Sequence, residues 1–381
     1  MRRTVSIVVA AVLAIVVVVT IIVAAGGGSS KKNLTIVRGA IGSEKQPFFD
    51  DPAVKKEFAA HGFDVQVDTA GSRAIAKTFD LSKYDFAFPA GAPAALKIRT
   101  ERHVTQSYVP FSTPMAIATF RDIAQLLEKA GIAHDHGGYW TLDMKGYLDL
   151  VRRGVRWNQL KGNTTYPSTK YVLISSTDVT TSNSAAMYAS IASYVANNNS
   201  VVENPAQVDG VVSAVSPLFL KQGYTEQSSE GLFEDYLSIG EGKTPMEMIY
   251  EAQFVARAAG HDGSIQPNMV LMYPDPLIVS QHTLVPLTAN GSAVGQLLTD
   301  DPKLQALAVE HGFRTAKPAD FAAFVQRSQI TVQPRLLNVI DPPTYDNLED
   351  LITKIDAALH AQLGPRSTPA TTEALNRSGT P

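Results

Sequence analysis

A repeated order of elements constrains the fold of this chain more than any other feature. A short apolar segment, a loop of small residues and a helical pattern follow one another three times between residues 34 and 98. The expected strands are residues 34–37, 63–68 and 84–88. Repeated strand–loop–helix units favour a parallel sheet covered by helices, so this region predicts a doubly wound α/β lobe. Its loops would lie at the carboxyl ends of the strands, where such sheets bind ligands.

The middle of the chain predicts a second lobe of the same class. Its expected strands are residues 115–118, 171–174 and 269–273, and its expected helices are residues 123–131, 144–155, 185–196 and 248–254. A strand at residues 283–287 and a helix at residues 301–311 follow. A chain that leaves one lobe and returns to it crosses at least twice. We therefore expect two doubly wound lobes joined by a hinge, with residues 34–114 and 275–363 in lobe 1 and residues 115–274 in lobe 2.

The N-terminus carries an apolar run from Val5 to Ala25, preceded by Arg2 and Arg3. About 20 apolar residues in a helix span a bilayer core, so residues 1–25 predict a transmembrane signal-anchor that contacts the lipid bilayer through residues 5–25. A cleaved signal peptide is the alternative, although its apolar segment is usually shorter. Residues 26–33 read as a flexible tether, and residues 364–381, rich in Pro, Thr and Ser, as a disordered tail.

Composition excludes several classes of function. The formal net charge of -3 and the pI near 6.2 give no basic excess, so no nucleic-acid partner is expected. The absence of cysteine removes disulfides, thiolate metal sites and cysteine nucleophiles. His134-Asp135-His136 has the spacing of a metal site but lacks a third ligand nearby, so a solvated loop is favoured. We expect no metal, no cofactor and no catalytic residue.

Two loops at expected helix starts suit a polar ligand. Gly71-Ser72-Arg73 and Thr180-Thr181-Ser182-Asn183-Ser184 offer glycine, hydroxyl groups and the free N–H groups of a helix N-terminus. Ordinary helix capping is the alternative, because the same residue types are preferred at N-caps. Gly42-Ser43-Glu44-Lys45 is a third candidate, although Glu44 and Lys45 also fit a solvated first turn. Glu251 is an acid in an expected apolar helix, which an exposed helix face explains as well as a cleft does.

Taken together, these segments resemble the type II periplasmic-binding-protein superfamily. The likeness is strongest to bacterial extracellular solute-binding domains of the molybdate type, which also occur fused to von Willebrand A domains. It rests on segments in order along the chain, among them residues 42–45, 70–73, 85–89, 113–118, 178–184, 249–254, 273–276 and 311–314. The resemblance implies crossing strands near residues 113–118 and 273–277. It places Gly42, Ser43, Ser72, Thr181, Ser182 and Asn183 at the ligand and Tyr273 near the hinge.

These observations predict a membrane-anchored, extracytoplasmic protein that captures a small polar molecule or anion between its lobes, for transport or sensing. The expected site residues are Gly42, Ser43, Gly71, Ser72, Arg73, Thr181, Ser182, Asn183 and Tyr273. A membrane permease or a surface protein would be the partner. Two alternatives stay open. The first is a surface interaction module that has lost its ligand. The second is a surface hydrolase, which would need a histidine within hydrogen-bond reach of a cleft serine.

Overall fold

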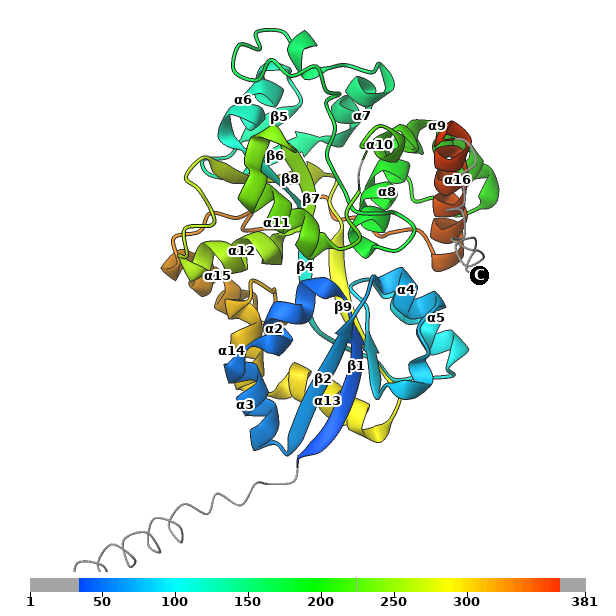
Figure 1. The fold of residues 1–381 in the computed structure, drawn as a ribbon, viewed down its shortest axis with the longest axis vertical. Coiled ribbons are helices and arrows are strands. Elements are labelled where there is room, and N and C mark those ends of the chain that lie inside the picture. Colours follow the sequence, from blue (N-terminus) through cyan, green and yellow to red (C-terminus); the bar gives the residue numbers. More distant parts are fainter. Residues whose placement is uncertain (1–33, 224, 364–381) are drawn as a thin grey trace, which may run out of the picture.

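The structure, a computed structural model, describes residues 34–223 and 225–363 (Figure 1). The expected membrane anchor, the tether and the tail at residues 364–381 lie outside these residues. Within them, no helix combines the length and the apolar character that a membrane crossing requires. The elements form two stacked parts, called here the lower part and the upper part after their positions in Figure 1.

The lower part contains three parallel strands, β1 (Thr35–Ile41), β2 (Phe63–Thr69) and β3 (Phe86–Phe88), with β1 in the middle. Successive side chains of a strand point to opposite faces of its sheet. Ile41 therefore enters a core on one face, while Ala40 enters a separate core on the other. The predicted order of strand, loop and helix is present throughout this part.

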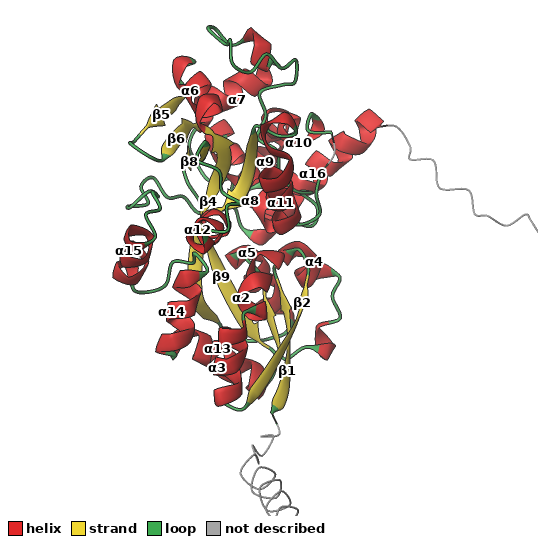
Figure 2. Cartoon of the chain, turned by 60° about the vertical axis from the view of Figure 1, so that its left-hand side comes forward, coloured by secondary structure: helices red, strands yellow, loops and turns green. Residues whose placement is uncertain are grey.

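Helices cover both faces of the lower sheet (Figure 2). The core on the Ile41 face is closed by α3, α13 and α14, and the core on the Ala40 face by α4 and α5. The bounds of the lower helices are α2 (Gln46–Asp50), α3 (Pro52–Ala60), α4 (Ser72–Lys77), α5 (Ala92–Glu101), α13 (Ala289–Asp300) and α14 (Pro302–Glu310), with the short 3-10 helices η1 (Ser43–Lys45) and η2 (Leu81–Lys83).

Strand β4 (Tyr108–Phe120) belongs to both parts. Its first half pairs antiparallel with β9 (Val279–Pro286), which also pairs with β3. Its second half pairs antiparallel with β7 (Met246–Tyr250) and β8 (Met269–Asp275). One run of hydrogen-bonded strands, β2-β1-β3-β9-β4-β8-β6-β5, therefore passes through both parts of the molecule.

Both sheets are mixed, because β9 lies antiparallel to β3 and β4 in the lower part and the upper sheet also contains antiparallel pairs. The expectation of purely parallel sheets is therefore wrong, although β1, β2 and β3 are parallel. Strand β6 (Trp140–Asp143) runs parallel to β8, but β5 (Ala133–Asp135) pairs antiparallel with β6. Strands β7 and β8 are both antiparallel to β4. The reason is topological: β4 carries the chain upward, and β7 and β8 each run back toward the lower part.

Two expected elements differ from the structure. Residues 248–254 do not form one helix, because residues 246–250 pair with β4 as strand β7 and the helix α12 begins only at Glu251. Residues 171–174 form no strand. The Val172 amide donates to Val155 O and the Ile174 amide to the Tyr147 hydroxyl, so these amides are not available for a ladder.

The upper helices enclose a single large core. It contains the buried aromatic side chains Trp140, Tyr147 and Trp157. The bounds of these elements are α6 (Arg121–Lys129), α7 (Met144–Arg152), η3 (Trp157–Gln159), α8 (Asn183–Ala196), α9 (Pro205–Val215), α10 (Pro217–Leu220), α11 (Ser229–Ile239), η4 (Gly240–Gly242) and α12 (Glu251–Gly260).

The C-terminal region does not return to the lower sheet as the expected lobe boundaries imply. Helix α15 (Pro318–Arg327) is followed by an irregular segment, residues 328–344, and by α16 (Tyr345–Leu363). Leu351 and Ile355 of α16 enter the upper core together with Phe324 of α15. By core membership, α15 and α16 belong with the upper part, although residues 275–363 were expected in lobe 1.

The shared strand provides a direct test of this architecture. Ile117 of β4 is fully buried, so Ile117→Ala should lower the free energy of unfolding by about 2–5 kcal/mol through lost burial and a cavity. Val109 on the same strand is 47% exposed, and Val109→Ala should cost less than about 1 kcal/mol. Chemical denaturation of both variants measures the difference. Equal losses would contradict the assignment of the second half of β4 to the core.

Candidate functional site

Two of the predicted loops lie against each other where the lower part meets the upper part. A Cβ atom added to Gly71 would lie 2.0 Å from the carbonyl oxygen of Thr181, and one added to Gly91 would lie 2.2 Å from Asn183 Oδ1. Backbone can approach backbone this closely only where no side chain intervenes. This region, formed by residues 42–45, 71–73, 89–92, 181–184 and 250–253 with β9, is called the junction below.

Helix starts at the junction lack side-chain caps. The N-cap residues Gly42 of η1, Gly71 of α4, Gly91 of α5 and Ser182 of α8 make no side-chain cap hydrogen bond. Several helices away from the junction are capped, among them α3 by Asp51, α9 by Asn204, α13 by Thr288 and α14 by Asp301, whereas α6, α10 and α15 also lack a side-chain cap. A helix N-terminus presents N–H groups and a partial positive charge. The N–H groups at these helix starts thus have no side-chain acceptor from an N-cap residue. A ligand at the junction could accept hydrogen bonds from them.

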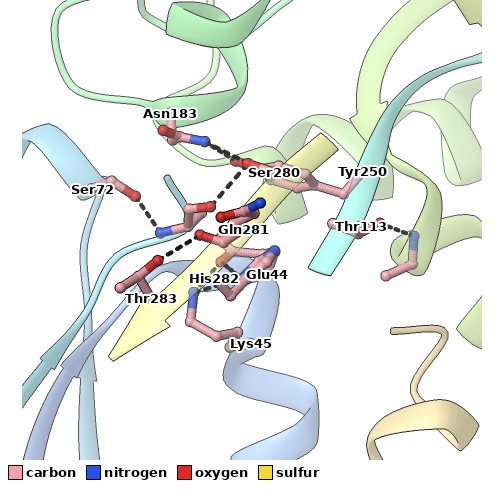
Figure 3. Close-up of polar contacts among 12 residues, drawn as sticks. Glu44, Lys45, Ser72, Thr113, Asn183, Tyr250, Ser280, Gln281, His282 and Thr283 are labelled. Atoms are coloured by element: carbon pink, nitrogen blue, oxygen red, sulfur yellow. Dashed lines mark hydrogen bonds and ion pairs between the residues drawn. The ribbon is translucent and has the colours of Figure 1, made fainter. Parts of the chain in front are cut away.

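A chain of hydrogen bonds links the two parts across β9 (Figure 3). The Ala90 amide donates to Ser72 Oγ at 2.8 Å, and the Ala90 carbonyl accepts from Ser280 Oγ at 2.9 Å. Asn183 Nδ2 donates to Ser280 Oγ at 3.1 Å and to the Tyr250 hydroxyl at 3.0 Å. Ser280 on the crossing strand therefore contacts a lower loop and an upper helix at once.

Glu44, Lys45 and His282 form a buried charged cluster beside this chain of hydrogen bonds (Figure 3). Lys45 Nζ contacts the Glu44 carboxylate and lies 3.1 Å from His282 Nδ1. Lys45 is fully buried and Glu44 is 9% exposed, so the solvated first turn considered for them is wrong. A buried ammonium donates, so His282 Nδ1 accepts from Lys45 and the proton of the neutral ring sits on Nε2.

Burial sets the ionisation of this cluster. Burial and the charge of Lys45 lower the pKa of His282 to about 4, so the ring is neutral at pH 7. Burial alone would raise the pKa of Glu44, but the charge of the adjacent Lys45 outweighs it, with a smaller contribution from His282, and the pKa is about 2. Burial also lowers the pKa of Lys45, while Glu44 acts in the opposite direction.

Two polar atoms of the junction are buried without a partner among the described residues. They are Oγ1 of Thr181 and Nε2 of His282. A buried donor or acceptor without a hydrogen bond costs about 1–3 kcal/mol. Such atoms are expected where the protein alone does not complete a network.

Arg73 makes contacts within the protein. Its Nε and Nη2 donate to the carboxylate of Glu349 on α16, each at 2.6 Å, and its Nη1 donates to Val179 O at 2.6 Å. Lys77 adds a third hydrogen bond to Glu349 at 2.5 Å. Since α16 packs into the upper core, the ion pairs of Arg73 and Lys77 with Glu349 connect α4 of the lower part to the upper part. A ligand-binding role for Arg73 stays a prediction.

Tyr273 lies in a different network from the loops. Its hydroxyl donates to Glu251 Oε2 at 2.6 Å, and Arg314 binds the same carboxylate through Nε and Nη2 at 2.7 and 2.8 Å. Glu251 is fully buried, so the exposed helix face considered for it is wrong. This ion pair joins the start of α12 to the chain after α14. Gly71, Ser72, Thr181, Ser182 and Asn183 thus come together, whereas Tyr273 stands apart from them.

Several residues of the junction were not predicted as site residues. Gly91 follows the third strand in the same way that Gly71 follows the second, so the repeat itself signals it. Tyr250 was assigned to a helix, which hid its place at the end of β7. Ser280 and His282 alternate with exposed Gln281 along β9, a pattern that indicates one buried face but not what that face meets.

One group of side chains among the described residues has the spacing of a metal site. Glu57, His61 and Asp301 offer ligand atoms within 4.8 Å of one another at the surface of the lower part. Lys303 pairs with Glu57, and Asp301 caps α14 through its other carboxylate oxygen. Because both carboxylates already have protein partners, we assign no metal to this group.

Comparison with known proteins identifies the fold. No protein-family model matches the chain, and no curated protein matches it in sequence. A periplasmic thiamin binding protein superposes with a TM-score of 0.58 at 9% identity, over 86% of this chain and 96% of that protein. Iron-bound HitA from Pseudomonas aeruginosa gives 0.52 at 11% identity, over 87% and 99%. The sulfate-binding protein SubI from Mycobacterium tuberculosis gives 0.50 at 17% identity, over 85% and 99%. The chain therefore has the periplasmic-binding-protein fold that the sequence resemblance implied.

The buried cluster predicts how stability depends on pH. The folded pKa of His282, about 4, lies below the ordinary value of 6.5, so the unfolded chain takes up this proton first. As the pH falls from 6.5 to 4, His282 should remove on the order of 3 kcal/mol from the free energy of unfolding. Glu44 should continue the loss between pH 4.5 and 2.

The contribution of His282 is measured as the difference between the wild type and His282→Gln, which keeps an acceptor for Lys45 but does not titrate. This difference is needed because burial raises the pKa of Glu247 to about 8, which acts oppositely between pH 4.5 and 8. Denaturant unfolding is measured at about pH 7, 6 and 5. As the pH falls over this range, the variant should lose less stability, or gain more, than the wild type does. The exposed His134 supplies the control, His134→Gln. A variant slope equal to that of the wild type would show that His282 is not held neutral by the fold.

Proposed function

We propose that this protein is an extracytoplasmic solute-binding protein that holds a small polar or anionic ligand at the junction. The observation that carries the proposal is the convergence of helix starts without side-chain caps from both parts, α4 and α5 below and α8 above. Residues 5–25 would anchor it in the cell membrane as a single span. The folded residues would then lie outside the cytoplasm.

The junction offers donors more readily than acceptors. Backbone amides at the starts of α4, α5 and α8 and the hydroxyl groups of Ser72, Thr181 and Ser182 suit the oxygen atoms of a ligand. Lys45 is the positive charge within the cluster, and Glu44 neutralises it. A polar ligand needs only the amides and hydroxyl groups, whereas a strongly anionic ligand would compete with Glu44 for Lys45.

Binding requires the two parts to move relative to each other. Gly71 and Thr181 are in van der Waals contact, so the structure corresponds to a closed arrangement. The parts are joined by β4, by the chain between β8 and β9 and by the chain between α14 and α15. Opening would therefore require bending near residues 113–118, 273–279 and 311–317. Closure around the ligand would be a hinge motion in which the ligand selects the closed state.

The superposed proteins support solute capture as the general function. Their names state that they bind thiamin, sulfate and iron, which are unlike one another, so the fold does not select the ligand of this chain. A membrane permease would receive the solute if the role is transport. A surface protein would take that place if the role is sensing.

A ligand-free interaction module on the same fold is the second candidate, and one observation favours it. Glu44 and Lys45 fill part of the junction with the protein's own ion pair. A hydrolase has less support. In the described part of the chain, no histidine hydrogen-bonds to a serine of the junction, and His282 Nδ1 faces Lys45. We assign no catalytic residue.

Thermal unfolding of the full chain against oxyanions, amino acids, sugars and metal salts tests the proposal. A ligand at 100-fold excess over its Kd should add about 2.7 kcal/mol to the stability of the folded state, which is a clear shift in Tm. The double variant Ser72→Ala with Ser182→Ala should lose most of the shift given by the active compound. A panel without any shift would favour the interaction module.

Gly71→Ala tests the need for closure. The new methyl group would collide with the Thr181 carbonyl, so the closed state should be destabilised and ligand affinity should fall at least about tenfold, which corresponds to roughly 1.4 kcal/mol. Gly210→Ala is the matched control, because a Cβ atom there meets nothing within 4 Å. Titration calorimetry with the active compound compares the three proteins. Undiminished affinity in Gly71→Ala would separate binding from closure.

A further inference from the structure

A cavity beside α15 is separate from the junction. It has a volume of about 560 Å³, which lies in the range of small-molecule sites. Its walls come from α15, from the irregular segment after it, and from Ser112 of β4 and Arg314, which form an isolated β-bridge with each other. It shares no lining residue with the junction. We propose that this cavity is a second ligand site, for an uncharged apolar molecule that carries one hydrogen-bond acceptor.

The walls explain the apolar body of the ligand. Phe321 and Val325 of α15 form one side, and Ile330, Val332 and Leu336 of the irregular segment form the other. Burial of apolar surface is favourable by roughly 25 cal/mol per Å². A molecule without extensive polar surface therefore gains the most binding free energy in this cavity. A sugar or an amino acid would lose its hydrogen bonds to water there and find no protein partners to replace them.

Arg314 is the reason why the proposed ligand carries one hydrogen-bond acceptor and no charge. Its Nε and Nη2 donate to Glu251, and Nη2 also donates to Gln333 O at 2.9 Å. Within the described chain no hydrogen bond uses Nη1, so its two N–H groups are available to a carbonyl oxygen, which can accept two hydrogen bonds. The fully buried Glu251 carboxylate already balances the guanidinium charge. A ligand anion would therefore find a donor but no uncompensated positive charge, which favours an uncharged acceptor such as a carbonyl.

The irregular segment is consistent with a binding role. Residues 328–344 connect α15 to α16 without a helix or a strand. Segments of this length without regular structure are uncommon inside compact domains and are frequently functional. The segment touches the crossing region through backbone bonds between Leu277 and residues 338 and 340. A ligand held beside it would thus contact the region where the two parts are joined.

The experiment uses the uncharged naphthalene dye Prodan, which has an apolar body and one carbonyl, with the full chain. Fluorescence titration should give saturable binding of one dye per chain. Ala322 is an exposed residue of α15 that lines the cavity, so Ala322→Trp should fill the cavity without disturbing the core and weaken binding at least tenfold. Ala293→Trp, at a different surface cavity, is the matched control and should bind as the wild type does. A dimethylaminonaphthalene without the carbonyl should bind severalfold more weakly than Prodan.

Melting curves of both tryptophan variants test whether each is folded. Subtracting the dye signal of Ala322→Trp from that of the wild type corrects for dye that binds outside the cavity. Equal binding by wild type and Ala322→Trp would overturn the site. Equal binding of the two dyes would overturn the role of the Arg314 donor. Loss of dye binding as the protein concentration rises would identify a second copy of the chain as the occupant and would also overturn the proposal.

Discussion

The hydrogen bonds of strand β4 determine how the rest of this molecule is arranged. Its first half is held by β9 and its second half by β7 and β8, so a single extended segment fixes the lower sheet relative to the upper one. Strand β9 runs beside it and brings Ser280 and His282 into the space between the parts. A strand cannot shift by one residue without exchanging its two faces, so the pairing also fixes which side chains reach the junction.

The junction itself is a compromise between packing and polarity. Burying Glu44, Lys45 and Asn183 is unfavourable unless their charges and hydrogen bonds are matched, and the structure matches most of them within the protein. The match is incomplete at Thr181 Oγ1 and His282 Nε2. Thr181 directly precedes the uncapped start of α8, so unused donors lie where the two parts touch.

Much of the lower part could be predicted from the sequence, because its information is local. Each strand, small-residue loop and helix is contiguous, and the loops at Gly71 and Thr181 were recognised from residue types alone. The remainder depends on long-range pairing. Ser280 donates a hydrogen bond to the Ala90 carbonyl, and the two residues are 190 positions apart in the sequence. No local sequence pattern indicates such a contact. Met248 to Tyr250 fit a helix by composition, but pairing with β4 makes them a strand. Arg73 was predicted to bind a ligand because it lies at a helix start. In the structure α16 places Glu349 beside it, and no local pattern indicates this contact.

The relative motion of the two parts can be measured directly, because the sequence contains no cysteine that would compete for labelling. Lys83→Cys and Arg152→Cys introduce labelling sites at exposed side chains, one below the junction and one above it. Single-molecule energy transfer between two dyes would then follow the distance across the junction. We expect an open population that the active solute converts to a closed one, and a loss of the closed population in Gly71→Ala. A single distance, unchanged by any solute and by the substitution, would contradict it.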